Sequence, residues 1–247
     1  MTTAEIAFGL AVFLLAGTVK GLVGLGLPTI TIALTSLVLP LTEAIALIAL
    51  PTIFTNVWQA AIGGRFWVIL RRQWPLIATL VISLYLTMWL VGQKGPNWAF
   101  LVLAAVLIVY SGLGLLRIRL HIHADLEKPL APVIGVVSGF VAGLVGVPII
   151  PLMPYLQGLD IKPSELVQSL GVVLCATSLT LTVSLLNFGL LDGPRAIVSA
   201  AAVVPALAGM WVGQQIRLRL SVEQFRLADQ NDVMIFGEVL EQKPELS

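Results

Sequence analysis

The sequence predicts an all-α fold: a polytopic helical membrane protein with two homologous halves. Three observations predict it, namely the composition, the long apolar runs and a Gly-rich phrase that occurs twice. Of the 247 residues, 58% are hydrophobic and only 11% are charged, whereas soluble domains are about 25% charged. A soluble fold of this size has too little interior for so many apolar side chains, so the bilayer must supply the apolar environment. The runs are also too long and unbroken for a β-barrel, whose strands alternate between apolar and polar residues.

Five apolar segments are long enough to cross a membrane as helices, because a bilayer core of about 30 Å requires about 20 helical residues. The predicted spans are 43–63, 73–92, 97–116, 164–187 and 194–213. The chain is therefore expected to cross the membrane several times.

Two further apolar regions, 6–39 and 130–158, are interrupted by glycines and prolines. Glycine frees the backbone, and proline removes an amide donor and kinks a helix. We therefore expect a broken helix in each region, with the first break at Lys20. The first region then splits into pieces 6–19 and 27–39. At about 1.5 Å per residue each piece reaches only about 20 Å, which is too short to span.

The two broken regions share a sequence, since "GTVKGLVG" at 17–24 and "GFVAGLVG" at 139–146 are identical at six of eight positions. The offset is 122 residues. The same offset relates Thr42-Glu43 to Ser164-Glu165, which are suited to helix starts, and Thr55-Asn56 to Thr177-Ser178. We infer an internal duplication, with repeat one at about 5–118 and repeat two at about 129–226.

The basic residues predict the topology. If region 130–158 returns to the side from which it starts, ten Lys and Arg lie on one side and only Lys94 and Arg195 on the other. The positive-inside rule then makes the loops 64–72, 117–129 and 214–226 cytoplasmic. If both broken regions are re-entrant, each half has three crossings. The halves are then oppositely oriented, as in the inverted repeats of secondary transporters.

The C-terminal tail departs from this repeat. The offset places a last span near 219–239, yet that stretch contains several charged residues. Each would cost about 2.5–3.5 kcal/mol at the centre of a span. The expected span is therefore missing or replaced by a polar tail, 227–247. Two explanations stay open: a truncated or shifted reading frame, and a tail that folds on the cytoplasmic surface.

Lys20 is the sharpest candidate for a binding role, because an intramembrane lysine is costly and usually faces a cavity or a partner. Backbone amides near Gly24 and Gly26, freed by the break, would add donors for an anion. Pro28 and Pro148 mark the starts of the second half-helices, and Thr29 would direct its hydroxyl at the anion. The alternative is that Lys20 reaches the surface or binds a structural carbonyl.

A polar stripe follows the first broken region. It consists of Thr52, Thr55, Asn56 and Gln59, which share one helix face. In the second half, Gln168, Ser169, Thr177 and Ser178 are the candidates for the matching role. Such a stripe either lines a path or hydrogen-bonds a neighbouring helix, and both interpretations stay open.

Several function classes lack support in the sequence. It contains no HExxH, GxSxG or P-loop motif, so we expect neither an enzyme nor an ATP-driven pump. The single cysteine, Cys175, can form neither a disulfide within the chain nor a zinc site, and we expect no metal or cofactor. The net charge of +1 argues against a nucleic-acid partner. The expected partners are a small anion and the lipid bilayer, with the oligomeric state open.

Four segments together resemble the TauE/SafE (sulfite exporter) family of bacterial membrane transporters. They are "GTVKGLVGLGLPTITIAL", "PTIFTNVWQAAIGG", "VPIIPLMPYLQGLDIKPSELVQSLG" and "PALAGMWVGQQIRLRLSVEQFR". The resemblance implies a single membrane domain over 1–226 with a duplicated core, and a final apolar span where this chain turns polar. It also implies secondary transport of sulfite or organosulfonates across the bacterial cytoplasmic membrane. An anion channel of the same fold and a non-transporting membrane scaffold are the alternatives.

Overall fold

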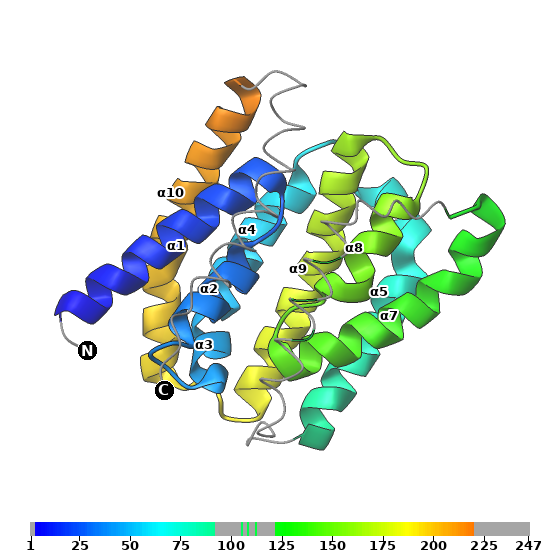
Figure 1. Cartoon of the computed structure of the whole chain (residues 1–247). Helices are drawn as coiled ribbons and strands as arrows, with labels where there is room; N and C mark the ends of the chain where they lie inside the picture. The colour runs from blue at the N-terminus through cyan, green and yellow to red at the C-terminus, as the bar shows by residue number, and fades with distance from the viewer. Residues whose placement is uncertain (1–2, 92–104, 106–107, 109–111, 113–121, 220–247) are drawn as a thin grey trace.

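The computed structural model describes residues 3–91, 105, 108, 112 and 122–219, and all regular structure in these parts is α-helical. Figure 1 shows the helices in chain order. They are α1 (Thr3–Val23), α2 (Leu27–Thr35), α3 (Leu41–Leu47), α4 (Ala49–Ala61), α5 (Phe66–Val91), α7 (Ala124–Val145), α8 (Ile149–Gly158), α9 (Pro163–Asn187) and α10 (Gly193–Arg219). By length and composition, four of the described helices can cross a membrane: α5, α7, α9 and α10.

Both broken regions are helix–break–helix hairpins, α1–α2 and α7–α8, but the first break lies later than predicted. Helix α1 runs through Lys20 to Val23, so the predicted break at Lys20 is wrong. The first piece is longer than predicted, since α1 has 21 residues, but its apolar part, Phe8–Val23, is shorter than the described helices that can cross a membrane. The break is made instead by Gly24 and Gly26, whose φ angles of 92° and 110° are left-handed and suit glycine.

The predicted spans agree with the helices to different degrees. Helix α9 matches the span 164–187 closely, whereas α5 and α10 extend beyond 73–92 and 194–213. The span 43–63 is divided at Ile48 into α3 and α4. Residues 117–129 are not all loop, because α7 already begins at Ala124. The span 97–116, apart from three residues, and the tail 227–247 lie outside the described residues.

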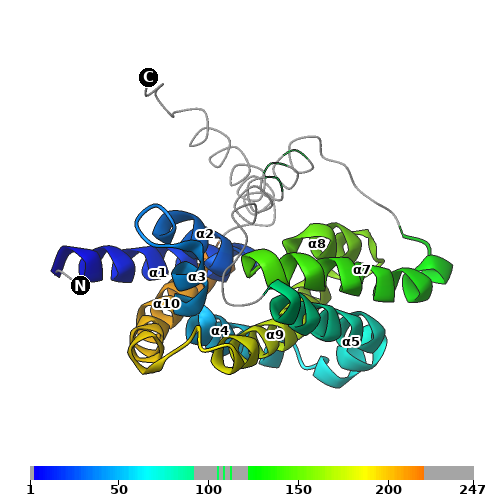
Figure 2. The ribbon, with the colours of Figure 1, turned by 90° about the horizontal axis from the view of Figure 1, so that it is seen from below.

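The helix bounds follow the offset of the sequence repeat. Helices α1 and α7 end at Val23 and Val145, and α2 and α8 begin at Leu27 and Ile149. The first helix of each hairpin packs along a long helix of the other half: α1 packs along α10, and α7 packs along α5. Figure 2 shows these two pairs on opposite sides, with α4 and α9 in contact between them.

Glycines allow the two outer pairs to approach closely. A Cβ at Gly17 would overlap the carbonyl of Ala206, and one at Gly139 would overlap the carbonyl of Leu80. Small residues at such positions let helix backbones touch within a membrane. The glycines that the two halves share therefore serve mainly to join the halves, and only Gly24 and its equivalent Gly146, with φ of 81°, make the breaks.

Ion pairs join the halves at two opposite ends of the molecule. At one, the Arg65 end, Arg65 pairs with Glu165 in the first turn of α9. At the other, the Arg195 end, Arg195 pairs with Glu43 in the first turn of α3 at 3.2 Å. Glu43 and Glu165, which the repeat makes equivalent, are thus first-turn acids, as predicted, and they lie at opposite ends.

Each hairpin returns to the end at which it starts. The amide of Ile122, before α7, donates to the carbonyl of Gly158 at the end of α8, at 2.9 Å. Helix α1 runs parallel to α10, because a Cβ at Gly17 meets Ala206 and one at Gly21 meets Met210. Its start is therefore level with the start of α10, at the Arg195 end, where α3 also begins.

Candidate functional site

The Lys20 side chain is buried in the middle of the bundle, with 1% of its surface exposed. Its position follows from the sequence around it, because the last turn of α1 carries Lys20 toward α4 just before the glycine break. The Nζ atom donates to Thr55 Oγ1 at 3.0 Å and to Asn56 Oδ1. Lys20 therefore does not reach the surface, and its hydrogen-bond partners are neutral side chains of the polar stripe.

Asn56 connects Lys20 to the second half. Its Nδ2 atom donates to the Leu174 carbonyl at 2.9 Å and to Ser178 Oγ at 3.3 Å. Asn56 and Ser178 are equivalent in the repeat, separated by 122 residues, so the two copies of this position touch each other. The residues that the sequence predicted as a stripe, Thr52, Thr55, Asn56 and Gln59, are all buried on α4.

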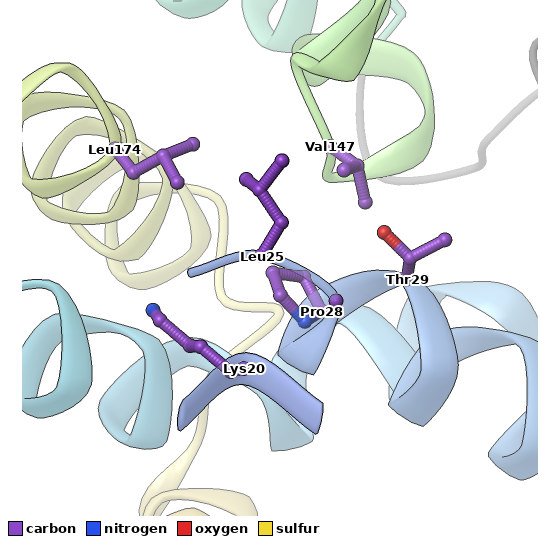
Figure 3. Close-up of a pocket in the computed structure, with 7 residues that line it drawn as sticks. Lys20, Leu25, Pro28, Thr29, Val147 and Leu174 are labelled. Atoms are coloured by element: carbon purple, nitrogen blue, oxygen red, sulfur yellow. The ribbon is translucent and has the colours of Figure 1, made fainter. Parts of the chain in front are cut away.

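A small cavity of about 10 Å³ adjoins Lys20. It is lined by Lys20, Leu25, Gly26, Pro28, Thr29, Val147 and Leu174. Figure 3 shows the Lys20 ammonium directed toward the Leu174 side, and the Thr29 hydroxyl directed toward the space beside Val147. That hydroxyl is buried without a hydrogen-bond partner. The space suffices for about one water molecule, so a bound oxyanion requires the hairpins to move apart.

The break exposes fewer backbone donors than predicted. Gly21 lies inside α1, and the amide of Gly24 donates to the Lys20 carbonyl at 2.7 Å, so neither amide is free. The remaining donors are at the start of α2, where the amides of Leu27 and Thr29 have no acceptor within the helix. Gly26 is the N-cap residue of α2 and lines the cavity.

The two glutamines that were predicted as site residues, Gln59 and Gln168, form hydrogen bonds with backbone groups and do not line the cavity. Gln59 Nε2 donates to the carbonyls of Gly24 at 3.0 Å and Val167 at 2.9 Å. Gln168 Nε2 donates to the Ala60 carbonyl at 2.9 Å, and its Oε1 accepts from the amide of Arg65 at 3.2 Å. Both side chains therefore fix the position of the first hairpin and of the α4–α5 turn relative to α9.

The other predicted residues of the second half also lie apart from Lys20. Ser169 is buried on α9, and Pro148 is the buried N-cap residue of α8, but neither lines the cavity. The apolar lining residues Leu25, Val147 and Leu174 were not predicted from the sequence. The sequence repeat does relate two of them, because Val147 lies 122 residues after Leu25 and is its equivalent in the second half.

No acid balances the charge of Lys20 among the residues that the structure describes. The ion pairs there all lie at the two ends of the bundle, and no cluster of metal-ligating side chains occurs in the same residues. A buried charge is costly unless it is paired. The geometry therefore provides one buried lysine with neutral hydrogen-bond partners beside a mostly apolar cavity.

Comparison with known proteins gives one match. The family model described as sulfite exporter TauE/SafE matches residues 9–228. Searches of curated proteins and of solved structures each found no match. The matched residues include the Lys20 cavity, all four described helices that are long enough to span, and both hairpins except for the start of α1 before residue 9. The chain belongs to the sulfite exporter TauE/SafE family, a family of membrane transporters of sulfite-type anions.

Proposed function

We propose that this protein is a secondary transporter that moves sulfite or organosulfonates across the bacterial cytoplasmic membrane by alternating access. The observation that carries the proposal is Lys20, a buried cation without a carboxylate partner in the described part of the chain. The anion would accept hydrogen bonds from Lys20 Nζ, the Thr29 hydroxyl and the first amides of α2. Asn56 and Thr55 would hold the ammonium in place, and Gly24, Gln59, Gln168, Ser169 and Pro148 would shape the hairpins around it.

The two halves are proposed to form an inverted repeat within one membrane domain, 1–226. Equivalent acids at opposite ends and hairpins that return to opposite ends support this arrangement. Apart from Arg195, the described Lys and Arg residues that are exposed or partly exposed gather near the Arg65 end, namely Arg65, Arg71, Arg72, Lys128, Lys162 and Arg217. The positive-inside rule then places the Arg65 end in the cytoplasm.

Alternating access would follow from this geometry. In the described state both ends carry an ion pair between the halves, and the space beside Lys20 is too small for an oxyanion. Opening one end at a time would expose Lys20 to one side of the membrane only. No coupling ion is part of this proposal, and movement down a gradient is sufficient for it.

The test is flux into proteoliposomes that contain the purified protein, with sulfite, sulfate, sulfoacetate and acetate offered in turn. We expect saturable sulfite uptake with counterflow. Lys20→Ala should lower it at least thirtyfold, because losing one partner of a buried charged contact costs about 2 kcal/mol or more. Lys128→Ala, the same change at an exposed lysine of α7, is the matched control.

Three results would change the proposal. Normal sulfite flux in a folded Lys20→Ala variant would remove Lys20 from the site. Flux without saturation or counterflow would favour an anion channel of the same fold. No flux of any anion in the unaltered protein would favour a non-transporting scaffold.

The orientation of the halves has a separate test in a variant whose only native cysteine, Cys175, is replaced by alanine. A cysteine at Asp160, which is exposed between α8 and α9, should react with a membrane-impermeant thiol reagent only from the cytoplasmic side. One at Asn187, exposed at the end of α9, should react only from outside. Labelling of Asp160→Cys from outside would contradict the re-entrant second hairpin.

A further inference from the structure

Among the described residues that line the Lys20 cavity, Lys20 is the one with an ionisable side chain. Apart from Lys20 and the Thr29 hydroxyl, the side chains that line it are Leu25, Pro28, Val147 and Leu174. The second half contributes only two of these apolar residues, and the repeat equivalent of Lys20 is Ala142, which is fully buried. A negative charge in this cavity can therefore be neutralised by Lys20 and by no second side chain of the lining.

Helix dipoles do not add a second charge, because each hairpin brings opposite helix ends together. Helix α1 ends at Val23 and α2 begins at Leu27, while α7 ends at Val145 and α8 begins at Ile149. The C-terminus of a helix carries about half a negative charge and the N-terminus about half a positive charge. Within each break the two contributions largely offset each other, and what remains is local hydrogen bonding by individual amides.

Three of the other described cations are paired with acids elsewhere. Arg65 and Arg195 pair with glutamates at the two ends. Arg72 forms a bidentate ion pair with Glu127, in which its Nε and Nη2 atoms donate to the two carboxylate oxygens at 2.5 and 2.7 Å. A second buried charge in the cavity would therefore remain uncompensated in apolar surroundings, where an isolated ion is strongly disfavoured.

We infer that the Lys20 site selects anions by their charge, taking a single negative charge and rejecting two. This inference rests on the proposed function and narrows its substrate class. Hydrogensulfite and organosulfonates with one ionised group would be carried, because each forms a neutral pair with the Lys20 ammonium. Sulfate, the sulfite dianion and sulfoacetate, which has both a sulfonate and a carboxylate, would be discriminated against.

The test compares anions of similar size and different charge in proteoliposomes of the unaltered protein. Ethanesulfonate should enter at least about tenfold faster than sulfoacetate, and methanesulfonate at least about tenfold faster than sulfate. Equal rates within either pair would overturn the inference while leaving the proposed function intact. Failure of all these anions and of sulfite to enter would instead contradict the proposed function.

A second measurement uses one substrate in two charge states. Lowering the pH through the second ionisation of sulfurous acid converts sulfite to hydrogensulfite, so the flux of total sulfite should rise. Ethanesulfonate keeps one charge across the same range, and its flux corrects for any titration of the protein itself, including Lys20 and the nearby Cys175. A sulfite-to-ethanesulfonate flux ratio that does not rise as the pH falls would count against selection by charge.

The repeat also offers a gain-of-function variant. In Ala142→Lys the new side chain would stand on α7 at the position equivalent to that of Lys20 on α1. Sulfoacetate flux relative to ethanesulfonate should rise at least about tenfold in this variant, and an unchanged ratio in folded protein would contradict the inference. If the variant does not fold, the two comparisons on the unaltered protein decide the matter.

Discussion

The two hairpins have nearly the same backbone and different chemistry. Helices α1 and α7 end at equivalent residues, each followed by a left-handed glycine, and each packs through glycines on a long helix of the other half. Thr55 recurs as Thr177, but several other polar residues of the first half are replaced in the second. Lys20, Thr29, Asn56 and Gln59 correspond to Ala142, Pro151, Ser178 and Leu181.

The comparison separates the features that both halves share, such as the glycines, from Lys20, which only the first half contains. The glycines recur because both halves dock on each other in the same way. The lysine occurs once, because the position equivalent to Lys20 is the buried Ala142. In the proposed function, this one charged hairpin supplies the lysine of the transport site.

Substitution of the docking glycines should have the largest effect and should be equal in the two hairpins. Gly17→Val and Gly139→Val place atoms on the carbonyls of Ala206 and Leu80. We expect each to destabilise the fold by about 3 kcal/mol or more, measured as loss of monodisperse protein after heating in detergent. Gly9→Ala is the control, because its Cβ would meet nothing within 4 Å. A large difference in stability between Gly17→Val and Gly139→Val would contradict the structural equivalence of the two hairpins.

Substitution of Asn56 and of its equivalent Ser178 should sharpen the contrast between the halves. Asn56→Ala leaves Lys20 with Thr55 alone and should lower sulfite flux by about tenfold, which corresponds to about 1.4 kcal/mol. Ser178→Ala removes a bond of 3.3 Å while Asn56 keeps its bond to Leu174, so we expect less than about threefold. Equal losses in proteoliposome assays would show that both halves carry the site.

Thr29 and Thr31 test whether a hydroxyl without a partner serves the anion. Both are buried on α2 without a hydrogen bond, but only Thr29 lines the cavity. Thr29→Val should raise the KM for sulfite about threefold to tenfold, as expected for one hydrogen bond, without lowering thermal stability. Thr31→Val should leave KM unchanged. The same KM for both variants would remove Thr29 from the site.

Neutralising Glu165 and Glu43, the acids at the two ends, should have the smallest effect on stability. The two changes should open the Lys20 region to opposite sides of the membrane. Glu165→Gln and Glu43→Gln each break a pair of partly exposed side chains, which are worth less than about 1 kcal/mol. Labelling of Cys175, the native thiol near Lys20, should become faster from the cytoplasm in Glu165→Gln and from outside in Glu43→Gln. Faster labelling from the same side in both variants would contradict opposite orientation of the halves.

The sequence by itself determined the class of protein, the family and the positions of both hairpins. These features depend on composition, on the period of a helix and on an ungapped repeat, all of which can be read along the chain. It also singled out Lys20 and the stripe from Thr52 to Gln59, because a charge and a polar helix face both need partners away from lipid.

Only the tertiary structure decided what these residues contact. Gly17 and Gly139 serve as docking positions rather than breaks because α10 and α5 lie against them. Gln59 holds the carbonyls of Gly24 and Val167, and Lys20 lies beside neutral partners. Such contacts depend on which distant helices meet, and that is set by the packing of both halves together rather than by any local pattern.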